Sequence, residues 1–372
     1  METGCSICCK NDRYIKLRTC PFHKHEGRDL MSFQLSASSF QLHFSRFKVD
    51  RINAMPSPVY LAFGIELELS LVSSKKFSSW SSMAKDISHR LSKKGISNQV
   101  TENPDHAYQV WSIVQEITIP SLPAKNKWGV ELVSPIFTLD SSWLTDLEVI
   151  FSEIRKVYKI QTSSQCSTHI HVSQLGHDMS PHQLAAIAQA ALVYEPCLDI
   201  LVPGERSSAY WCRSNRQSTF LATMHSLPHC LDQLEVASVQ EDGVGAIVES
   251  MCLFPASSPY GRAHGLKKDF IHGKVYKWNL ARLLSPDAEA RTIEYRQPAG
   301  STCTEDAMGW ALLTLCFIVG SFESRSGSAS SLDDVTLWAE FWEHLCRGAD
   351  ALNLDTFMLD YLRSFLDMRA KK

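Results

Sequence analysis

The sequence has no apolar run that reaches the roughly 20 residues of a membrane span. Its closest candidate, residues 307–322, is shorter, and we expect it to form a buried helix. The formal net charge of −3 shows no large excess of either sign, so we predict neither nucleic acid nor a membrane as a partner. The first twenty residues contain no apolar segment typical of a secretory signal, and we therefore expect a cytoplasmic protein.

The sequence also lacks the glycine-rich patterns GxxxxGK[ST] and GxGxxG, which disfavours P-loop and Rossmann nucleotide sites. The twelve cysteines are dispersed along a long chain, so we expect reduced thiols rather than disulfides. One cluster, Cys5, Cys8 and Cys20 with His23 nearby, has residue types that bind zinc. No second C-x-x-C pair completes this pattern, and we favour an N-terminal arm without a metal.

What remains is an ordinary globular composition, with 372 residues of which 44% are hydrophobic and 21% charged. A chain of this length can bury a substantial core. We predict three parts: a flexible N-terminal appendage over residues 1–58, a catalytic domain over 59–325, and a C-terminal helical segment over 326–372 that packs on the domain. Strands alternate irregularly with helices, which indicates an α+β fold with a largely antiparallel sheet.

Apolar spacing and capping residues predict the individual elements. The expected strands cover residues 62–72, 108–119, 128–137, 166–175 and 291–297. The expected helices cover residues 78–94, 140–159, 180–201, 304–322, 331–346 and 353–369. Residues 202–275 are expected to be rich in loops.

The strand AFGIELELSLV, residues 62–72, alternates strictly between two faces. Ile65, Leu67 and Leu69 lie on one face, which we expect to cover a core. Glu66 and Glu68 lie on the other face, roughly 7 Å apart. Two such carboxylates are either ordinary solvent-exposed residues or part of a cation site.

Three later strands repeat this pattern, with an apolar back and a front of metal-ligand or anion-binding residues. Their front residues are His169 and His171, then Glu294 and Arg296, and finally Glu131. Each strand alone fits an exposed histidine pair or a cross-strand charge ladder. Four carboxylates on one sheet face, however, repel one another unless cations neutralise them. Oxygen-rich ligands with one or two imidazoles favour Mg²⁺ or Mn²⁺ over structural zinc.

The motifs GIELE, GVELVSP, STHIHVS and TIEYRQPAGS, in this order, resemble the putative amidoligase family. This family belongs to the carboxylate–amine ligase superfamily with the glutamine synthetase fold. The resemblance covers about residues 60–320. It implies a curved, largely antiparallel sheet backed by helices, with ATP and Mg²⁺ or Mn²⁺ bound on its concave face. It also implies an ATP-dependent ligase that forms an amide, isopeptide or γ-glutamyl-type bond through an acyl phosphate.

The resemblance further implies roles for the residues that match the motifs. The matching metal ligands are Glu66, Glu68, Glu131, His169 and Glu294. His171 and Arg296 match the catalytic residues that face the phosphate or substrate. Lys277 and Asn279 match a K-x-N segment with a nucleotide or substrate role. Tyr295 stands where the family often has Phe.

Several alternatives stay open on the sequence alone. The same residues suit a metal-dependent hydrolase of amide bonds, a phosphotransferase, or a non-catalytic nucleotide-binding relative. We expect a small-molecule or peptide carboxylate and an amine as substrates, whereas the oligomeric state is open. The loops between residues 202 and 275 offer further contacts, with Arg206 as a nucleotide ligand and Tyr210, Arg213 and His264 as substrate contacts. An ordinary packing or surface role fits each of these four residues equally well.

Overall fold

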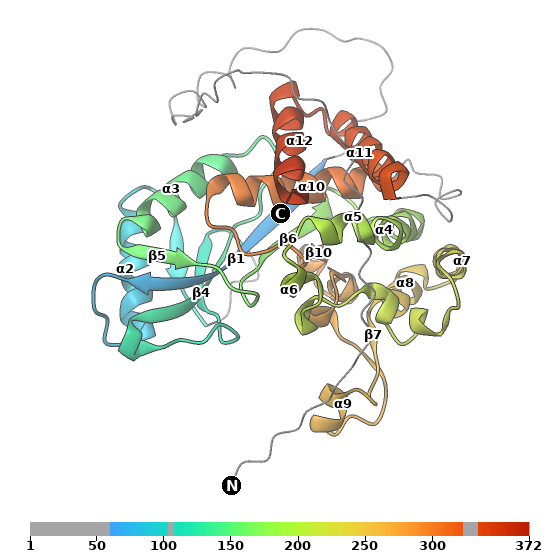
Figure 1. The fold of residues 1–372 in the computed structure, drawn as a ribbon, viewed down its shortest axis with the longest axis horizontal. Coiled ribbons are helices and arrows are strands. Elements are labelled where there is room, and N and C mark those ends of the chain that lie inside the picture. The colour runs from blue at the N-terminus through green and yellow to red at the C-terminus, as the bar shows by residue number, and fades with distance from the viewer. Residues whose placement is uncertain (1–59, 103–107, 323–333, 372) are drawn as a thin grey trace, which may run out of the picture. The chain divides into compact units, whose positions relative to one another are not determined.

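Strand β1 (Leu61–Ser73) lies in the middle of an eight-stranded sheet (Figure 1). The computed structural model describes residues 60–102, 108–322 and 334–371, which belong to one unit, Met55–Lys372. The expected appendage of residues 1–58, with its cysteine cluster, lies outside the described residues.

The sheet order is β2-β3-β4-β1-β6-β10-β9, and β5 pairs with the second half of β1. All of these pairs are antiparallel except β2 with β3. The remaining strands are β2 (Asn98–Val100), β3 (Trp111–Gln115), β4 (Lys127–Val133), β5 (Tyr158–Gln161), β6 (Thr168–Gln174), β9 (Trp278–Asn279) and β10 (Ile293–Tyr295). The unit is therefore α+β with a mostly antiparallel sheet, as the sequence predicts.

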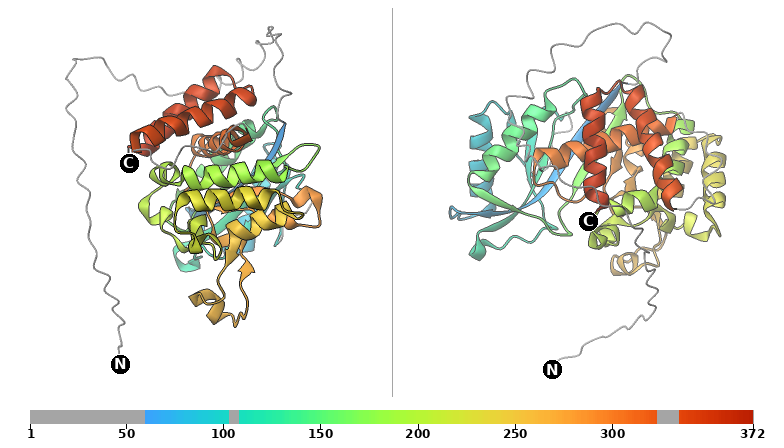
Figure 2. Two further views of the ribbon diagram at one scale, coloured as in Figure 1. Left: turned by 90° about the vertical axis from the view of Figure 1, so that its right-hand side faces the viewer. Right: turned by 45° about the horizontal axis from the view of Figure 1, so that its top comes forward.

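Seven of the described helices have at least twelve residues, and shorter helical segments lie between them. Their bounds are α2 (Trp80–Ser92), α3 (Trp143–Arg155), α4 (Pro181–Val193), α5 (Glu195–Ile200), α6 (Gly204–Ser207), α7 (Leu227–Ser238), α8 (Gly243–Cys252), α9 (Pro259–Ala263), α10 (Thr304–Phe322), α11 (Asp334–Ala351) and α12 (Thr356–Ala370). Helix α10 packs against β1 and β6, while α11 and α12 cover its outer side (Figure 2).

The apolar back of the sheet is held by close packing against α10. Leu67 and Ile170 on this back face are fully buried. Further along the face, the Tyr295 ring stacks on Trp278 with centroids 4.4 Å apart, and Trp278 stacks on Phe317 of α10 at 4.9 Å. This packing fixes the central strands from behind and orients their opposite face.

Helix α10 is long and apolar enough to cross a membrane by length and composition alone. Most of it is buried inside the unit, as in the core helix of a soluble protein. Its neighbours approach its backbone closely. A Cβ atom on Gly348 of α11 would lie 1.9 Å from the Cys316 carbonyl oxygen, so only glycine allows this distance.

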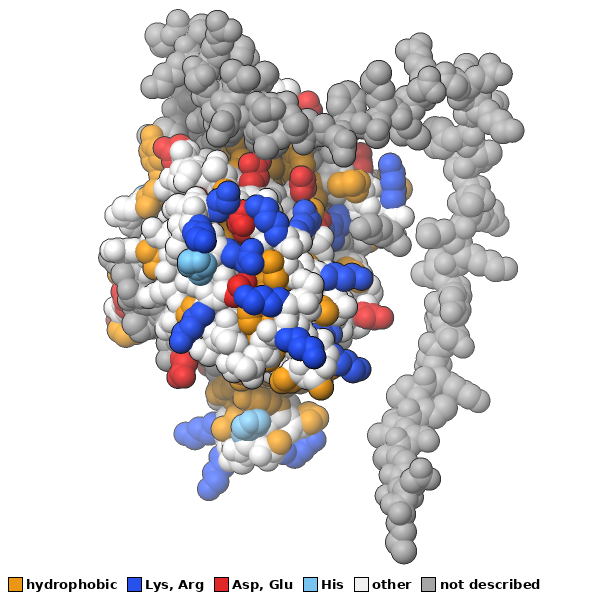
Figure 3. All heavy atoms as spheres, turned by 90° about the vertical axis from the view of Figure 1, so that its left-hand side faces the viewer, with side chains coloured by type: hydrophobic (Ala, Val, Ile, Leu, Met, Phe, Trp, Pro, Cys, Tyr) orange, Lys and Arg blue, Asp and Glu red, His pale blue; other side chains and the backbone are white. Residues whose placement is uncertain are grey.

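The side of the unit that carries α2 and β5 displays many Lys and Arg side chains (Figure 3). We call its exposed lysines the α2 face: Lys75, Lys76, Lys85, Lys93, Lys94, Lys125 and Lys159. Lys75 pairs with Asp86. Lys94 lies 3.8 Å from Glu153.

Two helix starts agree with their capping signals. Ser79 caps α2 through a reciprocal capping box with Ser82. Ser180 caps α4 in the same way with Gln183, and Pro181 occupies the first turn, where its missing N–H leaves no bond unmade. Gly95 follows α2 with a φ of 83°, the left-handed conformation expected after a helix end.

The segment over residues 202–275 is rich in loops and short 3₁₀ turns, as expected, but it also contains α7 and α8, which the sequence did not predict. Glycines at 243 and 245 and a proline at 228 favour a loop interpretation. In the structure, Pro228 lies in the first turn of α7, and the Asp242 side chain accepts a hydrogen bond from Gly245 N at the start of α8. Both helices are stabilised by packing against α4.

Several element bounds also differ from expectation. The strand expected over 108–119 is reduced to Trp111–Gln115. The helix expected over 140–159 ends at Arg155, and its last residues enter strand β5 beside β1. The helix expected over 180–201 is broken into α4 and α5, because Pro196 has no N–H for a continuous helix.

Candidate active site

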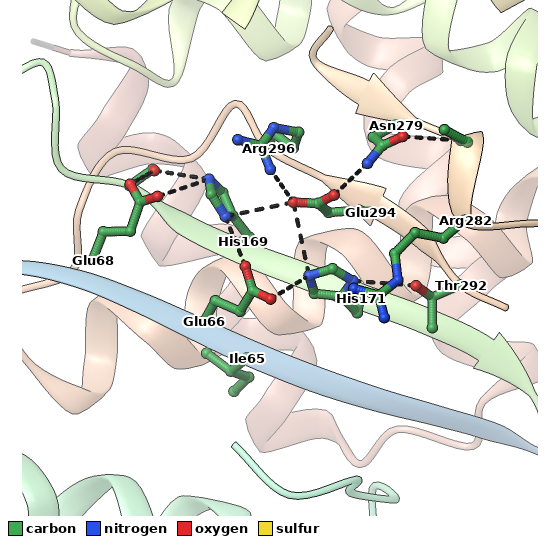
Figure 4. A network of polar contacts seen from close by, with 12 residues as sticks. Ile65, Glu66, Glu68, His169, His171, Asn279, Arg282, Thr292, Glu294 and Arg296 are labelled. Carbon is green, nitrogen blue, oxygen red and sulfur yellow. Dashed lines mark hydrogen bonds and ion pairs between the residues drawn. The ribbon is translucent and has the colours of Figure 1, made fainter. Parts of the chain in front are cut away.

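Polar side chains form three successive rows on the front face of the central strands, and Figure 4 shows Glu66, His169, His171 and Glu294 of the first two rows pointing toward one another. The strand register pairs His171 with Glu294, Glu66 with His169, and Glu68 with Glu131. The structure thus brings together all the metal ligands implied by the sequence resemblance. They come from β1, β4, β6 and β10, four strands that are adjacent in the sheet.

The first two rows form a compact group of two imidazoles and two carboxylates. His169 Nδ1 lies 3.1 Å from Glu66 Oε2 and 3.5 Å from Glu294 Oε1. His171 Nε2 lies 3.0 Å from Glu66 Oε1 and 3.7 Å from Glu294 Oε1. The other ring nitrogen of His171, Nδ1, is 3.1 Å from the Thr292 hydroxyl, which fixes the ring orientation.

Charge interactions within this group shift the pKa values of its members. Burial by itself would raise the pKa of Glu66, but the charge of His171 and contacts from both imidazoles hold it well below its usual range. Burial likewise opposes ionisation of Glu294, and Arg296 and His171 lower its pKa. Burial would lower the pKa of His171, but Glu66 and Glu294 raise it.

The third row is richer in carboxylates and poorer in cations. The Ser167 hydroxyl hydrogen-bonds Glu68 and lies 2.8 Å from His169 Nε2. Burial, together with the charges of Glu66, Glu68 and Glu116, raises the pKa of Glu131 to about 10. Crowded carboxylates that hold a proton at neutral pH are the environment in which divalent cations bind, because the cation replaces the proton.

The chemistry of this donor set fits Mg²⁺ or Mn²⁺. The potential ligand atoms form three groups, and within each group the atoms lie within 4.8 Å of one another. These groups are Glu66, His171 and Glu294; Glu66, Glu131 and His169; and Glu68, Glu116 and Glu131. Oxygen ligands dominate, and no cysteine belongs to any of the groups found among the described residues.

Arg296 and Asn279 flank Glu294 on the same face. Arg296 donates to Glu294 Oε1, and Asn279 Nδ2 lies 2.5 Å from Glu294 Oε2. The Arg296 side chain is 11% exposed, and its Nε makes no hydrogen bond within the described part of the chain. One edge of a buried guanidinium therefore stays available for an anion.

Lys277 and Arg206 lie close by but are engaged by protein groups. Lys277 Nζ lies 2.7 Å from Glu195 Oε1 and 2.5 Å from Asp199 Oδ1, both on α5. Arg206 is buried and donates to the backbone carbonyls of Ser164, Arg296 and Gln297. These contacts fix the backbone of the residues that follow β10, including Arg296.

The sequence reasoning missed three residues at this site: Ser167, Glu116 and Arg282. Arg282 lies beside His171 and Thr292 (Figure 4), and its Nη2 donates to the Tyr108 hydroxyl at 3.0 Å. Burial by itself would lower the pKa of Arg282, but Tyr108, Glu66 and Glu294 outweigh this effect and raise it. Arg282 follows the K-x-N segment by three residues, a signal that could have drawn attention to it.

A cavity opens next to the first row. A small pocket of about 50 Å³ is bounded by Glu66, His171, Arg282 and Thr292, among others. It shares Ala62, Ile136 and Ser173 with a larger cavity of about 890 Å³. Apolar side chains such as Leu175, Val244 and Leu283 line the larger cavity, together with Arg291 and Ser285. The cluster is therefore accessible at the His171 end of the strands.

The other suggested contacts, Tyr210, Arg213 and His264, lie near the hairpin of β7 (Leu253–Phe254) and β8 (Phe270–Ile271). The Arg213 guanidinium lies 5.3 Å from the centre of the Phe254 ring. His264 stacks on Tyr260 with centroids 4.0 Å apart. These contacts join them to the hairpin and not to the carboxylate cluster.

Comparison with known proteins adds one match. No curated protein matches the chain. A family model described as a putative amidoligase enzyme matches residues 60–318, which include every strand of the front-face cluster. This match covers more than half of the chain. The chain therefore belongs to the amidoligase enzyme family.

Proposed function

We propose that the protein is an ATP-dependent carboxylate–amine ligase with a glutamine synthetase-like fold. The observation that carries the proposal is the front face, where four strand carboxylates, two histidines and Arg296 converge. The mostly antiparallel sheet backed by α10 is consistent with that fold. The substrates of the proposed reaction are a small-molecule or peptide carboxylate, an amine and ATP.

The strand carboxylates with His169 would hold Mg²⁺ or Mn²⁺, which supplies positive charge to phosphate oxygens. A carboxylate is a poor electrophile. In the proposed reaction its oxygen attacks the terminal phosphorus of ATP and ADP departs, which gives an acyl phosphate. The amine nitrogen then attacks the acyl carbon and inorganic phosphate departs.

The residues of this chain contribute position and charge to both steps. Glu294 and the buried surroundings fix the Arg296 guanidinium, whose Nε edge can neutralise charge on the transferred group. Thr292 orients His171, whose Nε2 faces the same region. Preorganised donors of this kind stabilise charge in the transition state without reorganisation.

In this proposal the nucleotide occupies the 890 Å³ cavity beyond His171. Its size falls in the range of small-molecule sites, and its apolar walls suit a purine ring. Arg282 lines the small pocket together with Glu66 and His171, so a phosphate chain that reaches from the larger cavity to the cluster would pass a cation.

The test uses purified protein, Mg²⁺, ATP and a panel of carboxylates and amines. We expect ADP release that requires both substrates, together with a product whose mass is the sum of the two less one water. With an ¹⁸O-labelled carboxylate, one ¹⁸O atom should appear in the released phosphate. ADP release without ¹⁸O transfer rejects the acyl phosphate.

The same assay separates the alternatives. Amide hydrolysis that proceeds without ATP would support the hydrolase instead. A phosphorylated product without condensation would support the phosphotransferase. Absence of turnover with retained ATP binding would support a non-catalytic relative.

A further inference from the structure

The segment from β7 to β8, residues 253–272, projects from the unit as an arm that carries α9 (Figure 1). Strands β7 and β8 pair antiparallel, with Phe254 opposite Phe270. Phe254, Tyr260, Phe270 and His272 pack on one another with ring centroids between 5.2 and 6.4 Å apart. The arm therefore has an aromatic core of its own and holds a defined shape.

The arm is basic, although the whole chain has a net charge of −3. Arg262, Lys267 and Lys268 are exposed on it, and Lys274 is exposed at its root. The single carboxylate between residues 255 and 274, Asp269, accepts a hydrogen bond from Ala256 N. In Figure 3 the arm lies at the lower end of the unit and shows Lys and Arg side chains on both sides.

The root of the arm reaches the carboxylate cluster. A Cβ atom on Gly273 would lie 2.2 Å from the Asn279 side-chain oxygen, so this backbone is pressed against the amide that holds Glu294. Lys274 is near enough to Glu131 to oppose the rise in its pKa. Burial lowers the pKa of His272, which follows β8 at the root of the arm, and the charge of Arg296 lowers it further.

Positively charged side chains thus extend from the tip of the arm to Lys274, whose charge acts on Glu131, and to Arg296, whose charge acts on His272. By the strand register, Glu131 belongs to the row furthest from His171 and the large cavity. The arm root meets the cluster at Asn279 of β9, and the small pocket that adjoins the cavity meets it at His171 of β6, on the other side of Glu294. With the nucleotide in the cavity, the side of the cluster next to the arm root is left for another substrate.

We propose that the basic arm binds an acidic polypeptide segment and that one of its side-chain carboxylates is the acyl donor. This inference rests on the proposed function, because it assigns the carboxylate substrate of that site. The carboxylate oxygen bonds to the terminal phosphorus of ATP and displaces ADP. The amine then bonds to the acyl carbon, phosphate leaves, and the surplus amine proton passes to solvent.

Charge complementarity and reaction chemistry together favour a polypeptide rich in Asp and Glu. Such a segment offers several carboxylates to the tip of the arm while presenting one to the cluster. Tyr210 and Trp211, 39% and 41% exposed, stand beside the arm, with Trp211 in ring contact with His272. They give the chain of a bound peptide an apolar surface.

The test measures binding of fluorescent poly-L-glutamate to the full chain without nucleotide. The variant Arg262→Glu/Lys267→Glu/Lys268→Glu should bind about tenfold or more weakly, since three exposed charges are reversed. The matched control Lys85→Glu/Lys125→Glu/Lys159→Glu makes the same charge change on the α2 face. It should bind within about twofold of the wild type.

Equal binding by all three proteins, or a larger loss in the control, overturns the inference. Tighter arm-dependent binding of a single-stranded oligonucleotide with the same number of charges overturns the choice of polypeptide. Thermal melting of each variant reports whether it is folded, and the single variant Lys268→Glu, with a smaller loss, provides a second comparison if the triple variant is not.

The two proposals fail in different ways. Arm-dependent binding with no ADP release under any substrate contradicts the proposed function alone. Where turnover is found, the arm variant should raise KM for poly-L-glutamate about tenfold and leave kcat nearly unchanged, because it weakens docking rather than chemistry.

Discussion

On the front face of the sheet, His171 lies against Glu66 and Glu294, whose charges raise its pKa although burial lowers it. Behind the sheet, burial lowers the pKa of His344 to about 4. Its Nε2 lies 2.9 Å from the Phe317 carbonyl oxygen, so the neutral ring donates one hydrogen bond inside an aromatic cluster. Both residues are buried histidines.

The contrast shows that burial alone does not define the role of an ionisable residue. The partners differ: two carboxylates for His171, and a carbonyl oxygen with aromatic rings for His344. The front face holds ionic groups whose charges require one another, while the back holds neutral groups that pack. Substitutions on the two faces should consequently affect different measurable quantities.

The largest expected effect is on catalysis from the front face. Glu66→Gln keeps the shape of the side chain but removes the charge shared by His169 and His171. We expect amine-dependent ADP release to fall by roughly a thousandfold or more, with the melting temperature little changed. Glu235→Gln, at an exposed position of α7, is the matched control and should be fully active. Normal turnover by Glu66→Gln would show that this face is not catalytic.

The back face should respond in stability instead. Leu67→Ala, next to Glu66 on the same strand, empties a site that is fully buried. We expect the free energy of unfolding to fall by about 3 kcal/mol, measured by denaturant titration. The activity of the molecules that remain folded should stay close to wild type. A specific loss of activity at full stability would remove the distinction between the faces.

The low pKa of His344, behind the sheet, predicts that the free energy of unfolding depends on pH. Its folded pKa of about 4 lies below its usual value, so the unfolded chain binds the proton more tightly. The stability it contributes is present above pH 6.5 and is lost as the pH falls towards 4. Between pH 7 and pH 5 we expect a loss of about 2 kcal/mol from this residue.

Denaturant titrations of wild type and His344→Gln at these two pH values isolate this contribution. The variant should show a smaller loss of unfolding free energy between pH 7 and pH 5. An equal loss in both proteins would assign the effect to other groups.

The smallest expected effect distinguishes support from binding at Arg206. Arg206→Lys keeps the charge but cannot serve three backbone carbonyls at once. We expect about 1–2 kcal/mol of destabilisation, with KM for ATP within about twofold of wild type. A large rise in KM for ATP at unchanged stability would restore the nucleotide role suggested by the sequence.

The strand alternation predicted much of the front face. Because side chains alternate with a period of two, the faces of Glu66, His169 and Glu294 follow from the sequence once the strands are identified. The order of the strands and their register did not follow, since these depend on contacts between distant segments. The structure supplied both, and with them the separation of the three rows.

Residues outside regular strands were the ones missed. Arg282 lies in a short 3₁₀ segment, where no strand periodicity links it to the cluster, and Glu116 lies just after β3, within the longer strand expected there. Helices α7 and α8 were missed for another reason: tertiary packing against α4 overrides the local preferences of Pro228 and Gly243.

The rows of the front face also have a consequence for how the protein folds. Glu66 and His169 are 103 residues apart in the chain, and His171 and Thr292 are 121 residues apart. Contacts of such sequence separation form slowly, because long loops must close first. During synthesis, the carboxylates of β1 emerge well before the histidines and the arginine that balance them. Maturation of the site should therefore be a late step, and we expect divalent cations to speed its completion during refolding.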